Sequence, residues 1–488
     1  MPQSNPLLLA FYGDDFTGST DALESMSTSG ARTVLFIEPP TVEQVRQYEG
    51  LQAIGIAGLS RSLSPADMER ELLPTFKALK SLSPRHVHYK VCSTFDSSPS
   101  IGNIGKAIEI GAEVFQSPWV PILVAAPSLG RYCAFGNLFA RMGIGSQGVI
   151  HRLDRHPSMS VHPITPAHES DLRLHLAQQT ERTTGLFDIL QIEQPEPSVT
   201  FQEVLQKGFD NILFDALYDH HLPRIGKLLE ENTPSHAPLF SVGSSGIGSA
   251  LGAYWQQTGQ LQARTAWESV DIDTPILVIS GSCSPVSARQ IVWAEKHGFA
   301  SLSIDTAAVV EAENTLEVLE IIIQEAIQTI RRGQSVIVHT SKDNQDPRID
   351  QTNAIFEQKG LTPAEIRSRT GQLFGNALGT VAREVVAQTN IQRVVVAGGD
   401  TSSYAARAMG IEAVEMLSPL TPGAPICLAH APSSALDGKQ VIFKGGQVGA
   451  ENYYETVLGV SQNPNSRGRG FSKPRRHQTL GFEKPSRG

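Results

Sequence analysis

Two adjacent carboxylates, Asp14 and Asp15, follow the apolar run of residues 7–12 and precede the small residues 17–19. This order, which continues into an Ala/Leu/Glu segment, predicts a strand, a loop and a helix. Either Asp15 or Thr17 could be the N-cap of that helix, because a short oxygen side chain accepts hydrogen bonds from free backbone N–H groups. A cap does not need two acids. Since ligands bind beyond the carboxyl ends of strands in open α/β sheets, the pair is a candidate for proton abstraction or cation binding.

Two basic residues also stand at the ends of predicted strands. Arg61 follows the apolar run of residues 51–59, and Lys90 lies at the end of the run of residues 86–91. A small acid with several hydroxyl groups would need cations for its carboxylate and polar partners for its hydroxyls. Other residues suited to such a ligand are Ser93, Thr94, Asp96, Asn103, Arg131 and Asn137. Taken singly, each is more typical of a surface or helix-capping position.

Glycine-rich loops follow three strands predicted in the second half of the chain. They read SGSCSP at residues 280–285, GGDTSS at 398–403 and KGGQVG at 444–449. A glycine loop before a helix lets backbone N–H groups face a phosphate, and the alternative for the second loop is a tight turn with a Thr cap. Together the loops describe a rim able to hold a triphosphate or adenosine. The sequence lacks the G-x-x-x-x-G-K-[ST] pattern, which argues against a P-loop enzyme.

A further glycine segment, Gly243 to Gly252, is close to a dinucleotide-binding fingerprint but has the wrong last spacing. Because of this segment, an NAD-dependent oxidoreductase is an alternative class for the protein. Close packing of a helix is the interpretation that we favour for these glycines.

Short β-rich runs alternate with helical segments, which predicts two α/β domains with mostly parallel sheets. The first series lies at residues 7–12, 32–38, 51–59, 86–91, 121–127, 187–193, 211–217 and 238–243. The second series lies at residues 275–284, 300–306, 335–341, 393–403, 424–432 and 440–449, with long helices predicted over 314–333 and 366–389. Weak patterning from 252 to 273 predicts domains at 1–255 and 272–460. The composition of residues 461–488 predicts a disordered basic tail.

Charge and composition exclude several classes of protein. The formal net charge is -9, and residues 463–488 carry seven Lys or Arg and one Glu, so the rest of the chain carries about -15. This balance argues against nucleic acid as the main partner. No apolar run approaches the ~20 residues of a membrane span, and the start lacks the basic region of a secretory signal, so we expect a cytoplasmic protein. The four cysteines and the scattered histidines lack metal-site spacing, and no metal ligand is assigned among them.

The motifs occur together in one known family. The chain resembles the four-carbon acid sugar kinase family, which phosphorylates threonate, erythronate or 3-oxo-tetronate with ATP. The resemblance covers residues 7–458 and rests on six segments in the family's order: DDFTG at 14–18, Y-K-x-x-S-T at 89–94, SGSCSP at 280–285, GGDTS at 398–402, PG-P at 422–425 and K-x-G-x-x-G at 444–449.

The resemblance implies a sugar-acid domain followed by a nucleotide domain, with the active site in the cleft between them. Substrate contacts would carry over to Asp14, Asp15, Arg61 and Lys90. We expect Asp15 to take the proton from the attacking hydroxyl. Contacts to ATP would carry over to Ser282, Ser284, Gly398, Gly399, Asp400, Thr401 and Gly446. Mg²⁺ would help to neutralise the phosphates, with Asp400 a candidate ligand.

The sequence departs from the family pattern in the substrate domain. Cys92 stands where the family commonly has Asp, and FDSSPSIGN at 95–103 replaces an Arg-Gly pair. The departures concern the identity of the sugar acid more than the type of reaction. A non-catalytic sugar-acid-binding protein is a third class, and the pattern is compatible with a homo-oligomer.

Overall fold

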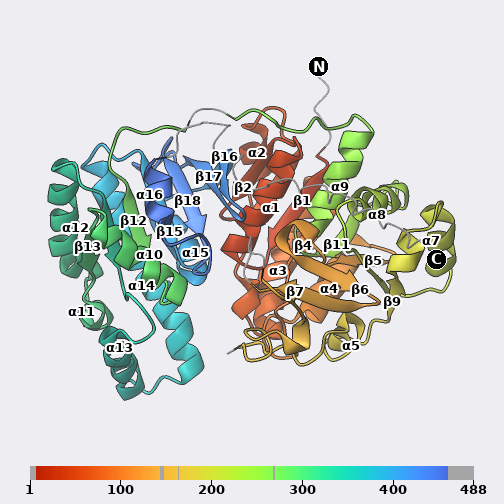
Figure 1. Ribbon diagram of the computed structural model, residues 1–488, viewed down its shortest axis with the longest axis horizontal. Coiled ribbons are helices and arrows are strands. Elements are labelled where there is room, and N and C mark those ends of the chain that lie inside the picture. The colour runs from red at the N-terminus through yellow and green to blue at the C-terminus, as the bar shows by residue number, and fades with distance from the viewer. Residues whose placement is uncertain (1–6, 143–147, 163, 268–269, 460–488) are drawn as a thin grey trace, which may run out of the picture.

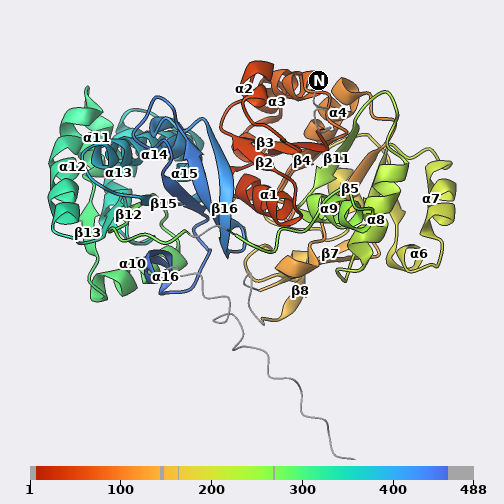
Figure 2. The same ribbon diagram turned by 90° about the horizontal axis from the view of Figure 1, so that it is seen from above.

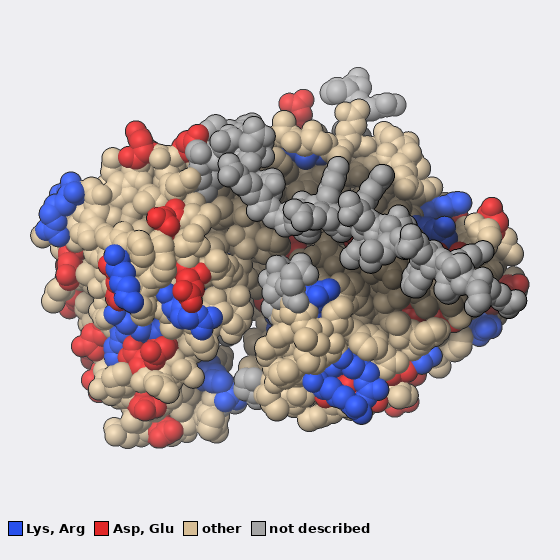
Figure 3. Space-filling model, viewed as in Figure 1, with Lys and Arg blue, Asp and Glu red and all other residues tan. Residues whose placement is uncertain are grey.

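The structure is a computed structural model that describes residues 7–142, 148–162, 164–267 and 270–459. These residues form two α/β halves that lie side by side, with the half that runs from red to light green on the right of Figure 1 and the half that runs from green to blue on the left. The predicted basic tail, 461–488, lies outside the described residues. On the face in Figure 3, acidic and basic side chains are interspersed.

The N-terminal half is built on parallel strands, and every one of them except the half-buried edge strand at residues 184–187 is buried throughout. Most are near-continuous apolar runs, as expected when helices cover both faces of a parallel sheet, but the strand at residues 86–90 also carries His86, His88 and Lys90. The strands in spatial order are β2 (Thr33–Phe36), β3 (Ala53–Ala57), β1 (Leu9–Gly13), β4 (His86–Lys90), β11 (Leu239–Gly243), β5 (Val120–Leu123), β10 (Asn211–Phe214) and β9 (Thr184–Phe187).

Helices flank this sheet, and a small antiparallel sheet follows β5 (Figure 1). The small sheet consists of β6 (Arg131–Ala134), β7 (Asn137–Arg141) and β8 (Ile150–Arg152). The helices are α1 (Phe16–Thr28), α2 (Val42–Arg46), α3 (Pro65–Ser81), α4 (Ile104–Phe115), α5 (Leu172–Leu176), α6 (Ile189–Ile192), α7 (Pro197–Leu205), α8 (His221–Glu231) and α9 (Gly246–Gln257).

The C-terminal half contains five parallel strands and one antiparallel hairpin. The parallel strands in spatial order are β13 (Ala300–Ser303), β14 (Val336–His339), β12 (Leu277–Ser280), β15 (Arg393–Ala397) and β18 (Gln440–Lys444). The hairpin strands β17 (Ala424–His430) and β16 (Ala413–Thr421) follow β18. The helices are α10 (Pro285–Lys296), α11 (Thr306–Glu311), α12 (Thr315–Arg331), α13 (Pro347–Gln358), α14 (Pro363–Ala387), α15 (Gly399–Ala408) and α16 (Tyr453–Leu458).

One ladder joins the halves into a continuous sheet. Strand β16 pairs antiparallel with β2, with Ala413 opposite Phe36 and Glu415 opposite Val34. Figure 2 shows β16 beside the first elements of the N-terminal half. The two halves therefore share backbone hydrogen bonds as well as side-chain contacts.

The α/β class and the two long helices expected from the sequence are confirmed, since α12 and α14 occupy the predicted segments. The strand predicted over 187–193 is wrong. There β9 ends at Phe187, and Asp188 caps α6 through a capping box with Gln191. No helix in the described segments is long and apolar enough to cross a membrane.

Candidate active site

One guanidinium group binds both adjacent acids. Arg61 lies in the 3-10 turn η1 (Ser60–Ser62), after β3. It donates to the two oxygens of Asp14 at 2.7 and 3.0 Å. It also donates to the two oxygens of Asp15 at 2.8 and 3.0 Å. Bidentate, charge-assisted pairing of this kind is strong and geometrically specific. Protein carboxylates therefore already neutralise the charge of Arg61.

Asp15 is also the N-cap of α1. Its Oδ1 accepts a hydrogen bond from the backbone N–H of Gly18 at 2.7 Å, and its Oδ2 accepts one from Thr17 Oγ1 at 2.8 Å. Each oxygen of Asp15 thus accepts two hydrogen bonds, one from the helix and one from Arg61. The capping interpretation of this acid, which the sequence offered, is confirmed.

The surroundings of Asp14 and Asp15 shift the pKa values of the two carboxyl groups in opposite directions. Burial raises the pKa of Asp14 above its usual value even though Arg61 acts to lower it. Burial also acts to raise the pKa of Asp15, but Arg61 and the hydrogen bonds from Thr17 and Gly18 bring it below its usual value. Asp15 is thus held as a carboxylate, while Asp14 binds a proton more readily.

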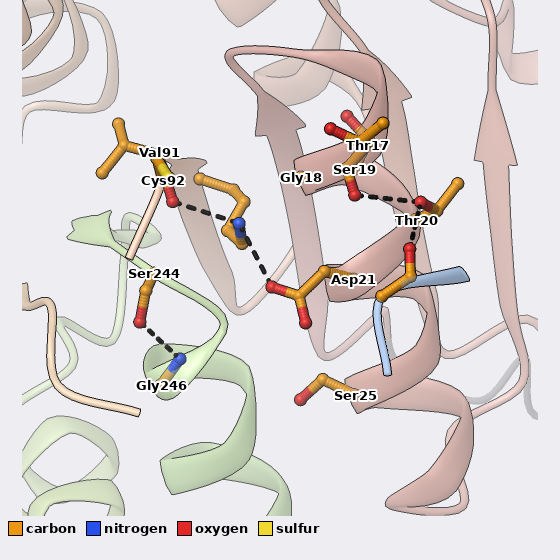
Figure 4. A network of polar contacts seen from close by, with 12 residues as sticks. Thr17, Gly18, Ser19, Thr20, Asp21, Ser25, Val91, Cys92, Ser244 and Gly246 are labelled. Carbon is orange, nitrogen blue, oxygen red and sulfur yellow. Dashed lines mark hydrogen bonds and ion pairs between the residues drawn. The ribbon is translucent and has the colours of Figure 1, made fainter. Parts of the chain in front are cut away.

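Lys90 pairs with an acid that the sequence analysis did not select. At the end of β4, its Nζ lies 3.3 Å from Oδ2 of Asp21 and donates to the carbonyl oxygen of Val91 at 3.0 Å (Figure 4). Asp21 lies on α1, three and four residues after Gly18 and Thr17, so all three share one helix face. That spacing was the sequence signal that could have identified Asp21.

Two cavities lie between the halves, and Asp21 lines both. The smaller, of about 120 Å³, is lined by Asp15, Arg61 and Lys90 from the N-terminal half and by Gly423 and Gly445 from the other half. The larger, of about 300 Å³, shares Asp21, Leu129, Pro422 and Gly423 with it and adds serine hydroxyls from α1 and α9. Of the residues expected to bind the sugar acid, Arg61 and Lys90 therefore line a cavity between the halves, whereas Asp14 is buried and does not line it.

The three glycine loops lie at one edge of the C-terminal sheet, because β12, β15 and β18 are adjacent and parallel. The Oγ of Ser284 caps α10 and donates to the carbonyl oxygen of Gly446. A Cβ on Gly446 would lie 2.5 Å from Ser282 Oγ. Gly398 has a φ of +130°, and its Cβ would lie 3.0 Å from Thr401 Oγ1. The two glycines thus allow the three loops to approach closely.

Gly399 and Asp400 begin α15 at this rim. A Cβ on Gly399 would meet no atom within 4 Å, so this position faces open space. The side chain of Asp400 lies outside the part of the chain that the structure describes.

A third cavity, of about 330 Å³, adjoins the rim and shares Gly281 and Thr401 with it. Its walls include Arg348, Asn353 and Phe374 of α13 and α14. The buried Oγ1 of Thr370, also in its wall, has no hydrogen-bond partner among the described residues, which suits a pocket that receives a polar ligand. The sequence analysis missed these residues because they lie on helices far from the glycine motifs in the chain.

The glycines of the 243–252 segment are explained by packing. A Cβ on Gly252 would lie 2.3 Å from Ser29 Oγ, next to α1, and one on Gly246 would lie 2.2 Å from the carbonyl oxygen of Ala125. The segment places α9 directly against α1 and the loop after β5. This arrangement agrees with the packing interpretation and gives the oxidoreductase alternative no support.

These features describe two α/β halves with cavities between them and a rim of glycine loops on the C-terminal half. Comparison with known proteins gives the same division. Residues 9–251 match a family described as the sugar-binding N-terminal domain, and residues 277–454 match one described as the nucleotide-binding C-terminal domain. The chain belongs to the four-carbon acid sugar kinase family, a family of ATP-dependent sugar-acid kinases.

Named relatives span nearly the whole chain. A 3-oxo-isoapionate kinase from Paraburkholderia graminis is 40% identical over 451 residues, which cover 92% of this chain and 94% of that protein. A 3-oxo-tetronate kinase from Pseudomonas savastanoi pv. phaseolicola is 28% identical over 454 residues, covering 92% and 96%.

Solved structures share the fold. A candidate tRNA synthase from Salmonella typhimurium LT2 has a TM-score of 0.71 at 24% identity, covering 93% of this chain and 99% of that one. A Haemophilus influenzae protein has a TM-score of 0.66 at 21% identity, covering 92% and 99%. At these identities the likeness establishes the fold alone.

Proposed function

We propose that this chain transfers the γ-phosphoryl group of ATP to a hydroxyl group of a 3-oxo sugar acid. The observation that carries the proposal is the 120 Å³ cavity, where Lys90 and Arg61 of the sugar-binding half meet Gly445 of the nucleotide-binding half. The names of the relatives support 3-oxo-isoapionate as the first acceptor to examine and 3-oxo-tetronate as the second. A cytoplasmic location and a homo-oligomer belong to the same proposal.

In this proposal the rim of glycine loops binds the phosphates of ATP. Backbone N–H groups at the start of α15 and in the 445–449 loop supply donors without a side chain in the way. The residues assigned to ATP are Ser282, Ser284, Gly398, Gly399, Asp400, Thr401 and Gly446. The adjoining 330 Å³ cavity has the size and mixed polarity that suit an adenosine group.

The sugar acid is assigned to the cavities beside α1. Among the described residues, Lys90 donates to or pairs with two protein acceptors, so a third ammonium hydrogen is left for the carboxylate of the ligand. Arg61 lines the cavity in an orientation that Asp14 and Asp15 fix, and these two carboxylates already neutralise its charge. The hydroxyls of Ser25 and Ser249, 3.0 Å apart in the larger cavity, suit the hydroxyl groups of the ligand.

Mg²⁺ belongs to the proposal through the nucleotide. The carboxylates of Asp15 and Asp21 at the cavity are paired with Arg61 and Lys90, so the described side chains form no dedicated cage for the ion. Phosphate oxygens usually supply several ligands of Mg²⁺ in such sites. The ion would neutralise phosphate charge, and the chain's part is to align the hydroxyl with the γ-phosphorus and to exclude water.

Asp15, expected from the sequence as the proton acceptor, has a geometry that favours a different role. Both of its oxygens are occupied, and its pKa is lowered, so it is a weak base unless Arg61 moves away. We assign Asp15 to the support of Arg61 and of the start of α1.

The test is the release of ADP from ATP and Mg²⁺ by the purified chain, with 3-oxo-isoapionate, 3-oxo-tetronate, threonate and erythronate as acceptors. The proposal predicts acceptor-dependent release with at least one 3-oxo acid. Release that is independent of every acceptor, or stabilisation against heat by NAD and not by ATP, would contradict it.

A further inference from the structure

One face of α1 forms the wall of both cavities between the halves. Thr17, Gly18 and Asp21 line the 120 Å³ cavity, and Asp21 and Ser25 line the 300 Å³ cavity. Asp21 comes four residues after Thr17, three after Gly18 and four before Ser25, so its side chain lies on the same helix face as theirs. Asp21 is the residue of α1 that lines both cavities, and its side chain is 19% exposed.

The nucleotide-binding half approaches Asp21 from the opposite side. The turn between β16 and β17 contributes Pro422 and Gly423 to both cavities, and Gly445 lines the smaller one. A Cβ on Gly445 would lie 3.9 Å from Thr17 Cγ2, one turn of α1 before Asp21. The glycine loop assigned to phosphate thus continues directly into the cavity that Asp21 lines.

The other acids near the cavities hold parts of the protein together. Asp14 and Asp15 bind Arg61. Glu24 accepts a hydrogen bond from the backbone N–H of Gly423 at 2.6 Å, which ties α1 to the turn of the other half. Asp21 is held on one oxygen, Oδ2, by Lys90 (Figure 4). A carboxylate held on one side and open to a cavity on the other can accept a proton from a bound hydroxyl.

We propose that Asp21 is the proton acceptor of the phosphoryl transfer, with Lys90 as the residue that positions it. This assignment rests on the proposed function. The hydroxyl oxygen of the sugar acid forms a bond to the γ-phosphorus while the bond from phosphorus to the β,γ-bridging oxygen breaks. ADP leaves with that electron pair. The hydroxyl proton moves to a carboxylate oxygen of Asp21 and from there to solvent through the larger cavity.

The experiment compares Asp21→Asn with the wild-type chain and with Asp273→Asn, a change at an exposed acid between the two halves. The amide keeps the shape of Asp21 but cannot accept the proton. We expect kcat to fall by about 100-fold or more, as for the loss of a general base. We expect the Kd values of ATP and of the 3-oxo acid, from calorimetric titration, to stay within about threefold. Asp273→Asn should match the wild type.

A second variant, Asp21→Ala, allows a measurement whose result would not change if Asp21 had only a structural role. Asp21→Ala opens space for a small carboxylate, and added formate should restore part of kcat in a concentration-dependent way. Formate should give no such rescue to Asp15→Ala, whose oxygens serve a cap and Arg61. Rescue would also support the assignment if Asp21→Asn proved poorly folded.

Three results would overturn the assignment. The first is a kcat of Asp21→Asn within threefold of the wild type. The second is recovery of kcat at high Mg²⁺, because Asp21 would then bind the ion. The third is the absence of formate rescue in a folded Asp21→Ala. A wild-type chain that binds ATP but phosphorylates none of the acids would instead contradict the proposed function itself.

Discussion

Asp14 and Asp15 are chemically identical neighbours, but their local contacts give the two carboxyl groups different pKa values. Both pair with Arg61, Asp14 buried and Asp15 half-buried, but only Asp15 also accepts hydrogen bonds from Thr17 and Gly18 at the start of α1. The pKa of Asp14 is consequently raised and that of Asp15 lowered. A pair of carboxylates of this kind holds an arginine in one orientation. This structural role accounts for the presence of both acids, and neither needs to be the proton acceptor.

Substitutions at Asp15 test this explanation through stability. Asp15→Asn retains an N-cap acceptor but removes the charge that faces Arg61, whereas Asp15→Ala removes both. We expect the melting temperature to fall in the order wild type, Asn, Ala, with the loss of the cap costing about 1 kcal/mol. Differential scanning calorimetry gives the order. Equal melting temperatures for all three proteins would show that Asp15 does not support α1 and Arg61.

Lys444 is a buried cation at the nucleotide edge of the sheet. Its Nζ lies 3.4 Å from Ser287 Oγ and 5.5 Å from the ring centroid of Tyr453. Burial lowers the pKa of Lys444 to about 7. The unfolded chain keeps this proton up to about pH 10.4, so between these values it binds more protons than the folded chain. The destabilisation from Lys444 is therefore largest below pH 7 and shrinks as the pH rises.

Lys444→Met should remove that pH dependence. We expect the variant to gain stability relative to the wild type at pH 6, and this gain to shrink by about 2 kcal/mol between pH 7 and pH 9. Denaturant unfolding of both proteins at each pH gives the difference, in which the titration of all other groups largely cancels. A difference that does not change with pH would mean that the lysine is not buried as a titrating group.

At the scale of elements, the start of α15 is open where the other glycine loops are tightly packed. A Cβ on Gly399 meets no atom within 4 Å, whereas one on Gly446 would lie 2.5 Å from Ser282 Oγ. The same methyl group therefore tests two different properties. At Gly399 it enters space that ATP would occupy, and at Gly446 it disturbs the loop itself.

We expect Gly399→Ala to keep or slightly raise the melting temperature without ligand, because alanine favours helix more than glycine does. The extra stability gained on adding ATP should shrink, because the methyl group obstructs the approach of phosphate to the backbone. Gly446→Ala, the comparison variant, should lower the melting temperature even without ATP. An undiminished ATP-induced shift in Gly399→Ala would remove Gly399 from the nucleotide site.

The elements that the sequence predicted well have strong local signals. Most of the buried parallel strands are apolar runs, and α14 begins with Pro363 and a capping box between Thr362 and Glu365. Strand β16 was not predicted, because its partners β2 and β17 come from different parts of the chain and it contains Pro419. Asp21 was not selected because the adjacent Asp14 and Asp15 carry the more conspicuous pattern, although helical spacing from Thr17 marks its position.

At the scale of the whole molecule, the continuous sheet fixes how the two halves meet. Beside the ladder of β2 and β16, Arg407 pairs with Glu38 at 2.6 Å and Arg32 with Glu415 at 3.4 Å. The turn that contains Gly423 is tied to α1 on both sides, since Thr20 Oγ1 donates to its carbonyl oxygen at 3.0 Å. These contacts hold the rim of glycine loops beside the cavity of Lys90 and Asp21, as the proposed transfer between two bound substrates requires.

The central claim is phosphoryl transfer between ligands of the two halves, and product analysis tests it most directly. The wild-type chain is incubated with ATP, Mg²⁺ and either 3-oxo-isoapionate or 3-oxo-tetronate, and ADP, inorganic phosphate and sugar-acid phosphate are quantified by mass spectrometry and phosphate assay. The account predicts one sugar-acid phosphate for each ADP, with little inorganic phosphate, and the loss of this product in Asp21→Asn. ADP formed together with an equal amount of inorganic phosphate and no phosphorylated acid would contradict it.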